Sequence, residues 1–503
     1  MLLLFFIFVP FFGAIFCLFF LRISSRFPII LTFFISCSCL LLSCLIYYKK
    51  FFVLTIGERK NLYLLEYCHK WIPEFGITFH FRLDGLSLLM IIMTSFLSCI
   101  AVLCDWRKKY KNSGLFYFLF LLILCSLLGC FISEDLFLFF FFWELSIFPV
   151  YFLILLWGDK NLDIKFLHYT LKKFLIYAHI SSVLLLISIL YLVQIYYEQT
   201  GLLTFDYLIL NKVILSQKIE FLLMLSFFLS FIIKTPLFPF LDWYSEIQIC
   251  APTSGSINIL YFLLKVSLYG FLRFNLYMLS QHRVLFSKIG IFLSIITILY
   301  SINKIFTLKN IKTIIIYLSV IHIAIIFYSL NYLNNFSLQG SVLSLCSYSL
   351  TTAALFMLLG FLKEYYQTNN FLVFKNISKV LSKFSSFFFF FIFSNIGLPG
   401  TGNFSGEILM FLGSFFFSPI LTTFIIFSLL FLSGFLLYII VQTYYGSYKI
   451  IKIFKQFTFL TYLILFFIIF LIFFIGLFPC IILDLSEYWI DCIYKKNLFF
   501  IKK

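Results

Sequence analysis

The sequence predicts an all-α, polytopic membrane protein with about 14 transmembrane helices. Of its 503 residues, 63% are hydrophobic and only 11% are charged, whereas soluble domains carry about 25% charged residues. Apolar runs of about twenty residues, each long enough to cross about 30 Å of hydrocarbon as a helix, recur along nearly the whole chain. Segments of about ten alternating residues, which build membrane barrels, are not found. The bilayer is therefore the predicted solvent for most of the surface.

These runs place the helices in order along the chain. The predicted helices lie near residues 1 to 22, 27 to 47, 85 to 104, 114 to 132, 135 to 157, 172 to 194, 219 to 240, 252 to 275, 286 to 306, 311 to 330, 339 to 362, 388 to 412, 418 to 442 and 457 to 479. The longest polar stretches between them are residues 48 to 84, 195 to 218 and 362 to 384. We expect these stretches to lie outside the membrane.

The basic residues lie mostly between the predicted helices. The net charge of +17 therefore indicates membrane orientation and contact with lipid rather than a nucleic-acid partner. Loops that follow odd-numbered helices hold 20 Lys and Arg residues, and loops and tails on the other side hold 15. Because short loops rich in basic residues stay on the side of synthesis, both termini are predicted on the opposite side.

Four ionisable residues fall deep inside predicted helices, namely Glu144, Lys234, Lys265 and Glu407. A charge at the bilayer centre costs about 2.5 to 3.5 kcal/mol on insertion scales, so such residues usually mark an ion or proton path. Lysine suits proton transfer because burial shifts its pKa readily, whereas arginine stays charged, and no arginine is expected in the middle of a helix. The alternative is that the four residues form two buried ion pairs that only hold helices together.

Two helix breaks are predicted inside the membrane, one directly after Lys234 and one directly before Glu407. The residues that break the helices are Pro236, Pro239, Pro399 and Gly400. Proline removes a backbone donor and kinks a helix. Broken helices are tolerated at membrane depth where they line hydrated cavities, and they point to transport sites.

Three further polar residues lie in or near predicted helices. His322 lies within an apolar run, where a hydrogen bond between helices and a proton relay explain it equally well. Tyr348 has an ordinary pKa of about 10, so it can bridge a water chain but donates a proton poorly at neutral pH. His179, near the start of its helix, is predicted to pack.

The thirteen cysteines are scattered and form no CxxC pair. A disulfide framework, a zinc site and an iron–sulfur cluster are therefore not favoured. We predict no metal-binding or cofactor-binding residue in this chain.

Several long blocks resemble the antiporter-like membrane subunits of respiratory complex I, NADH:ubiquinone oxidoreductase. They are Asp135 to Gly158 (DLFLFFFFWELSIFPVYFLILLWG), Lys234 to Phe274 (with KTPLFPFLDW, APTSGSI and LLKVSLYGFLRF), Lys312 to His322, Gln339 to Phe356, and GLPGTGNFSGE ending at Glu407. The blocks follow the family's order over most of the chain. A glutamate at 407, where sibling pumping chains usually carry lysine, resembles the chain 4 branch.

The resemblance implies two antiporter-like half-channel units, in residues 113–275 and 286–442. Residues 1–112 would hold N-terminal helices and a long extramembrane loop, and residues 443–503 a C-terminal helix and tail. Glu144 and Lys234 resemble the family's acid–lysine pair of the first half-channel, Lys265 the lysine that links the halves, and Glu407 the exit residue. His322 and Tyr348 would be candidate relay residues.

The chain departs from the family pattern at four positions. Leu241 and Gln248 stand where the family often has histidines, Tyr348 replaces a second central histidine, and Asn310 replaces a usual acid. These changes imply that the central hydrogen-bonded path relies more on water, or that the channel is partly degraded.

The first functional hypothesis is a proton-translocating subunit of complex I. Electron transfer from NADH to ubiquinone, with FMN and iron–sulfur clusters, would occur in partner subunits, and this chain would bind none of these cofactors. The expected partners are other membrane-arm subunits, including sibling antiporter-like chains, and lipids. The alternatives are a subunit of a multi-subunit cation/proton antiporter and a structural spacer of the membrane arm with a degenerate channel.

The abundance of phenylalanine, 76 residues, suggests an AT-rich organellar gene. The predicted location is therefore the mitochondrial inner membrane, with both termini on the intermembrane side.

Overall fold

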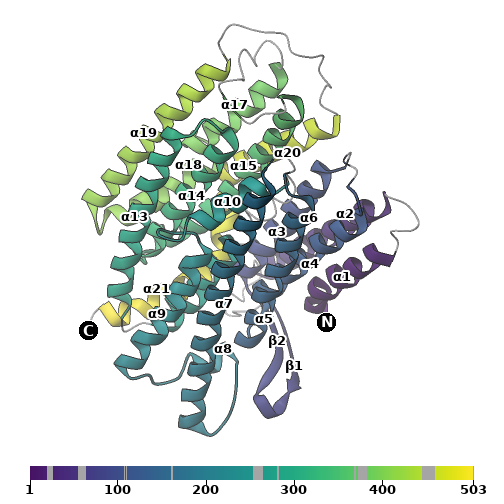
Figure 1. The fold of residues 1–503 in the computed structure, drawn as a ribbon. Helices are drawn as coiled ribbons and strands as arrows, with labels where there is room; N and C mark the ends of the chain where they lie inside the picture. The colour runs from purple at the N-terminus through teal and green to yellow at the C-terminus, as the bar shows by residue number, and fades with distance from the viewer. Residues whose placement is uncertain are drawn as a thin grey trace. The chain divides into compact units, whose positions relative to one another are not determined.

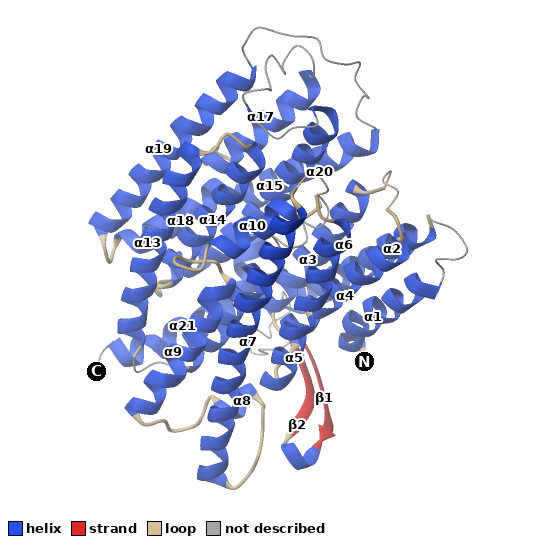
Figure 2. Cartoon of the chain, viewed as in Figure 1, coloured by secondary structure: helices blue, strands red, loops and turns tan. Residues whose placement is uncertain are grey.

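The computed structural model describes residues 1–19, 26–54, 64–106, 108, 110–159, 162–252, 264–279, 282–366, 370–371, 382–444 and 459–501. This part of the chain is almost entirely helical and contains one two-stranded sheet (Figures 1 and 2). The predicted all-α class is confirmed. The chain divides into two compact units: unit 1 comprises Met1–Pro236, Cys250–Phe286 and Lys496–Lys503, and unit 2 comprises Leu237–Ile249 and Ser287–Lys495.

Unit 1 is built from apolar helices and a β-hairpin. Its elements are α1 (Leu2–Phe19), α2 (Phe27–Leu54), β1 (Leu65–Ile72), the 3-10 turn η2 (Pro73–Phe75), β2 (Ile77–Leu83), α3 (Gly85–Cys104), α4 (Ser113–Ile132), α5 (Leu136–Leu145), α6 (Ile147–Trp157), α7 (Ile164–Thr200), α8 (Tyr207–Leu210), α9 (Gln217–Lys234), helical residues 264–270, the π-helical turn η3 (Phe271–Asn275) and α12 (Leu276–Met278). Helix α4 packs on α1, α3 and α5, and α7 packs on α9.

The hairpin lies at the end of unit 1 where α7 ends and α8 begins (Figure 2). Its strands pair antiparallel, with Leu65 opposite Leu83 and Ile72 opposite Ile77. The chain reverses at Gly76, whose φ of 68° lies in the left-handed region that glycine adopts without strain. Directly after β2, Asp84 and Ser87 form a reciprocal capping box that begins α3.

Unit 2 surrounds a nearly completely buried helix, α14. Its elements are α10 (Asp242–Cys250, up to Ile249), α13 (Arg283–Thr307, from Ser287), α14 (Ile311–Leu330), α15 (Asn335–Tyr366), α17 (Ser382–Ile396), α18 (Gly402–Phe415), α19 (Pro419–Tyr444), α20 (Phe459–Leu477) and α21 (Cys480–Ile501, up to Lys495). Helix α15 packs on α14, α17, α18 and α20. Buried α14 and α15 therefore form the core of this unit.

Eleven helices in the described residues are long and apolar enough to span a membrane, so the chain is a multi-pass membrane protein. The predicted helices without such a counterpart are residues 219 to 240, 252 to 275 and 388 to 412. The first is represented by α9, which carries Lys218, Glu220 and Lys234. The second includes residues 253–263, outside the described residues, and with them most of the APTSGSI motif. The third is divided into α17 and α18.

Candidate functional site

The first predicted helix break is present. Helix α9 ends at Lys234, and α10 begins at Asp242. At the end of α9, the backbone N–H and the hydroxyl of Thr235 both donate to the carbonyl of Phe231, at 2.8 and 3.0 Å. Within unit 2, the N–H of Phe238 donates to Oγ1 of Thr297 at 2.9 Å. Side chains thus help to satisfy the backbone groups that a broken helix frees at membrane depth.

Lys234 is buried against an aromatic ring. Its side chain is 5% exposed, and its Nζ lies 3.4 Å from the centroid of the Trp143 ring. Such a cation–π contact stabilises an ammonium group most when water is excluded. Among the described residues, no ion pair joins Lys234 to Glu144.

Glu144 pairs instead with His179. Its Oε1 lies 3.0 Å from Nδ1 of His179, which joins α5 to α7. The sequence assigned His179 to packing, and the structure gives it a carboxylate partner. The predicted pair is therefore found as two neighbouring contacts, Lys234 on Trp143 and Glu144 on His179.

Lys265 is also buried. It lies in helical residues 264–270 of unit 1 and is 7% exposed. Tyr269, one turn further along the same helix, donates its hydroxyl to the carbonyl of Phe131 at 3.0 Å. This burial agrees with the prediction that Lys265 lies deep inside a helix rather than in a loop.

The second predicted break is also present, between α17 and α18. Residues 397–401 interrupt the helix, and Gly397 and Gly400 have φ of 93° and 89°, which glycine tolerates best. The amide of Asn403 donates to the carbonyl of Ser394 across the break at 2.8 Å. A Cβ atom on Gly397 would come within 2.8 Å of Oε2 of Glu407. The break therefore leaves room for the carboxylate.

Glu407 joins the two candidate relay residues inside unit 2. The hydroxyl of Tyr348, on α15, donates to Oε1 of Glu407. The Tyr348 ring stacks on His322 of α14, with centroids 3.9 Å apart and an interplanar angle of 22°. Both ring nitrogens of His322 are buried without a hydrogen-bond partner among the described residues. Three ionisable side chains from three helices are thus contiguous.

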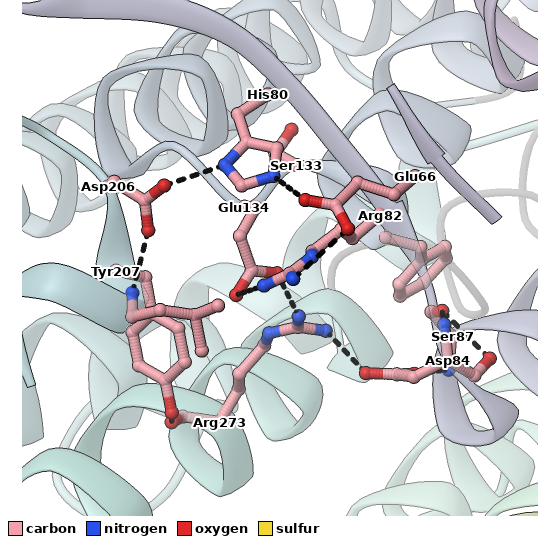
Figure 3. Close-up of polar contacts among 12 residues, drawn as sticks. Glu66, His80, Arg82, Asp84, Ser87, Ser133, Glu134, Asp206, Tyr207 and Arg273 are labelled. Carbon is pink, nitrogen blue, oxygen red and sulfur yellow. Dashed lines mark hydrogen bonds and ion pairs between the residues drawn. The ribbon is translucent and has the colours of Figure 1, made fainter. Parts of the chain in front are cut away.

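A second group of buried charges was not anticipated from the sequence (Figure 3). Arg273, which lies at the edge of the predicted helix 252–275, is 2% exposed in η3. It pairs with Glu134, between α4 and α5, and its Nη1 lies 3.0 Å from Oδ2 of Asp84. A cation at the end of a predicted helix cannot be told from a loop residue until its partners are known.

The same group continues into the hairpin (Figure 3). Arg82 lies 4.0 Å from Glu134 and 3.2 Å from Glu66. The two ring nitrogens of His80 lie 2.7 Å from Asp206 and 2.9 Å from Glu66. We call these seven residues the hairpin charge cluster: Glu66, His80, Arg82, Asp84, Glu134, Asp206 and Arg273. It links the hairpin to the ends of α3, α5, α8 and η3.

The pKa of His80 is raised above its ordinary value of 6.5. Burial opposes the charged imidazolium, but the hydrogen bonds to Asp206 and Glu66, and the negative charges of Asp206 and Glu134, together outweigh it. Burial acts to raise the pKa of Asp206, but the hydrogen bond to His80 and the charge of His80 lower it below its ordinary value. The hairpin charge cluster therefore favours a protonated His80.

Comparison with known proteins agrees with this architecture. Residues 133–435 match the family described as NADH:quinone oxidoreductase/Mrp antiporter, TM. NADH-quinone oxidoreductase subunit M of Buchnera aphidicola subsp. Baizongia pistaciae is 37% identical over 485 residues, covering 95% of this chain and 96% of that protein. NADH-ubiquinone oxidoreductase chain 4 of Chondrus crispus is 32% identical over 380 residues, covering 76% of this chain and 75% of that protein.

The fold is also similar to a solved structure. One chain of respiratory complex I from Thermus thermophilus has a TM-score of 0.84 and 21% sequence identity, covering 98% of this chain and 100% of that chain. The matched family model spans more than half of the sequence and includes both helix breaks and all four ionisable residues that the sequence singled out inside predicted helices. The chain therefore belongs to the NADH:quinone oxidoreductase/Mrp antiporter family of membrane subunits.

Proposed function

We propose that this chain is a proton-translocating membrane subunit of NADH:quinone oxidoreductase. The observation that carries the proposal is a buried ionisable residue at each helix break. Lys234 ends α9 two residues before Pro236, and Glu407 lies in the first turns of α18, the helix that follows residues 397–401. Ionisable residues at such breaks are typical of proton and ion pathways in membranes.

The proposed roles follow the chemistry of each side chain. Lys234 and Glu144 form the proton-loading pair of the first half-channel, and Lys265 passes the proton between the halves. In unit 2, water bonded to His322, the Tyr348 hydroxyl and the Glu407 carboxylate form the exit route. Moving one charge against 100 mV takes about 2.3 kcal/mol, which corresponds to a change of roughly two pKa units at about 1.4 kcal/mol each.

The energy for these steps comes from outside the chain. We propose that NADH, FMN, the iron–sulfur clusters and ubiquinone are all bound by partner subunits, and that neighbours in the membrane include sibling antiporter-like chains. We propose the same two half-channels that the sequence predicts. The first comprises residues 113–275 and the second residues 286–442, and residues 1–112 and 443–503 flank them.

The membrane is an energy-conserving one. The phenylalanine-rich composition favours the mitochondrial inner membrane, with both termini on the intermembrane side. The higher identity to a bacterial subunit M, 37% against 32% for a chain 4, favours a bacterial inner membrane as a second candidate. The proposed mechanism is the same in both.

A multi-subunit cation/proton antiporter is the second candidate function, because the matched family includes Mrp antiporters. Extraction in mild detergent distinguishes the two. We expect the chain to co-purify with flavin and iron–sulfur proteins, and NADH oxidation by that complex to acidify the outer medium of reconstituted vesicles. Co-purification with membrane antiporter subunits only, together with cation-dependent proton exchange, would establish the second candidate instead.

A further inference from the structure

Trp143 holds the Lys234 ammonium group over its ring. The side chain of Trp143 is completely buried, and the distance from Lys234 Nζ to the ring centroid is 3.4 Å. The indole N–H has no hydrogen-bond partner among the described residues. The ring therefore meets its surroundings through packing and through its face, and tryptophan is the side chain whose face attracts cations most strongly.

Neighbouring rings fix the orientation of Trp143. Phe231, one helical turn before Lys234 on α9, meets Trp143 edge to face, with centroids 5.8 Å apart and planes at 80°. Phe139, one turn before Trp143 on α5, lies 5.7 Å away. Phe274 of η3 contacts both Phe139 and Phe231, at 4.7 and 6.5 Å. Aromatic contacts from α5, α9 and η3 thus limit rotation of the ring under the ammonium group.

Glu144, the next residue on α5, is held by a different helix. Its carboxylate lies 3.0 Å from His179 on α7. Close to this contact, the hydroxyl of Ser181 donates to the carbonyl of Ser230 at 2.8 Å, which connects α7 to α9. Each member of the proposed proton-loading pair therefore has its own resting partner, on a framework of three connected helices.

On the basis of the proposed function, we propose that Trp143 and His179 are positioning residues that hold Lys234 and Glu144 apart between proton transfers. Lys234 and Glu144 can form a direct ion pair only when Lys234 leaves Trp143 or Glu144 leaves His179. Weakening either contact therefore favours the direct ion pair, which releases its proton more slowly.

The charge-holding role of Trp143 can be tested without changing its size. Fluorinated tryptophans with one, two or three fluorine atoms are introduced at position 143 alone, in the assembled NADH:quinone oxidoreductase in sealed vesicles. Fluorine withdraws electron density from the ring face while keeping nearly the same shape. We expect NADH-driven proton pumping to fall stepwise along the series, by about fivefold in total, because fluorination weakens the desolvated cation–π contact. A fivefold loss corresponds to about 1 kcal/mol.

Trp157 provides the matched control. Its contacts are a hydrogen bond from Nε1 to the carbonyl of Lys111, at 2.9 Å, and an edge-to-face contact with Phe116, and neither involves the face of the ring and a cation. Fluorination there should leave pumping unchanged. Equal stepwise losses at both positions, or a flat series at position 143, would refute the charge-holding role.

A combined variant tests whether the two positioning residues act on one pair. Trifluorotryptophan at 143 with His179→Gln should be little worse than the more impaired single variant, because each change alone already lets the pair close. Fully multiplicative losses would contradict the shared role. Lys234→Ala distinguishes failure of the proposed function from failure of the positioning role. If that variant pumps normally, the proposed function is wrong. If it loses pumping while the fluorine series at position 143 has no effect, only the positioning role of Trp143 is wrong.

Discussion

Glu144 and His179 show which part of the site can be predicted from the sequence. A carboxylate inside an apolar run is costly unless it has a function or a partner, so Glu144 could be singled out from its position alone. His179 could not, because it lies on a different helix and a histidine near a helix end is commonly a packing residue. The contact between them, 3.0 Å long, depends on how α5 and α7 are rotated, which hydrophobic periodicity does not specify in helices that are apolar on all sides.

Tyr348 could be predicted only in part. Its replacement of a family histidine suggested a weakened relay, yet its hydroxyl donates to Glu407 and its ring stacks on His322. A tyrosine at this position thus keeps the carboxylate and the histidine connected. Tyrosine in place of the family histidine therefore keeps a hydrogen-bond donor at position 348, which argues against the alternative that the channel is degraded here.

At the residue scale, His80 predicts a pH dependence of the hairpin. Because the pKa of His80 in the folded chain lies above that of the unfolded chain, its contribution to hairpin stability is complete below about pH 6.5. That contribution is lost as the pH rises through the folded value. Amide hydrogen exchange of residues 65–83, corrected for the intrinsic pH effect, should therefore show weaker protection in alkaline buffer.

His80→Gln is the matched variant for this measurement. It removes the titrating group, and with it charged hydrogen bonds worth about 1.5 to 3 kcal/mol. Protection in the variant should be lower throughout and should lack the pH step. A step of equal size in the variant would mean that another group causes it.

At the scale of elements, both helix breaks lie where the sequence placed them, because Pro236 and Pro239 and the Gly-Pro-Gly segment around Pro399 act locally on the backbone. Two predicted spans, at 219 to 240 and 388 to 412, lack a single long helix in the structure and carry Lys234 and Glu407. Charges and breaks lower the apolar character of a helix, so these two segments of the proposed pathway are less regular than the other spans of the described residues.

The hairpin charge cluster was missed because its members outside the hairpin lie next to or near the ends of helices. Asp84 precedes α3, Glu134 precedes α5, and Arg273 lies near the end of a predicted helix. In the sequence such residues resemble the solvated ends of spans. Only the pairing of β1 with β2, and the packing of α4, α5 and η3, brings these charges together.

Arg273 gives a stability prediction at this scale. Arg273→Leu should destabilise the assembled protein by about 3 to 5 kcal/mol, because it leaves the buried carboxylates of Glu134 and Asp84 without their counter-ion. The measurement is the temperature at which the complex is lost on native gels. Arg26→Leu, at an exposed position at the start of α2, is the control and should have little effect.

A second substitution checks the cause of the loss. Adding Glu134→Leu to Arg273→Leu removes one of the stranded charges and should restore part of the stability. If Arg273→Leu is as stable as Arg26→Leu, the buried pairing does not stabilise the protein.

At the scale of the whole molecule, the second break lies within unit 2, the first lies where the chain passes from unit 1 to unit 2, and each unit has its own ionisable groups inside helices. Unit 1 holds Glu144, Lys234 and Lys265, and unit 2 holds His322, Tyr348 and Glu407. The sequence placed these residues in two half-channels on the basis of family resemblance. It could not supply the contacts within each unit, because these are made between helices far apart along the chain.

The orientation of the chain in the membrane remains a prediction from the loop bias of 20 to 15 basic residues. Both termini should lie on the side away from synthesis, and the 105–111 loop on the side of synthesis. Single cysteines introduced at the termini and in this loop, labelled with a membrane-impermeant reagent in sealed vesicles, test this. Labelling of all three from the same face would contradict it.

We propose that protons pass through Lys234 and Glu144 in unit 1. This route is tested by measuring how vesicles that contain the assembled Lys234→Ala complex acidify the outer medium. Assembly is checked on native gels, with Glu144→Ala and the double variant measured beside it. We expect an assembled complex whose NADH-driven pumping falls at least tenfold in each single variant and little further in the double variant, because the two residues act as a unit. Acidification at the normal rate by an assembled Lys234→Ala complex would show that protons do not take this route.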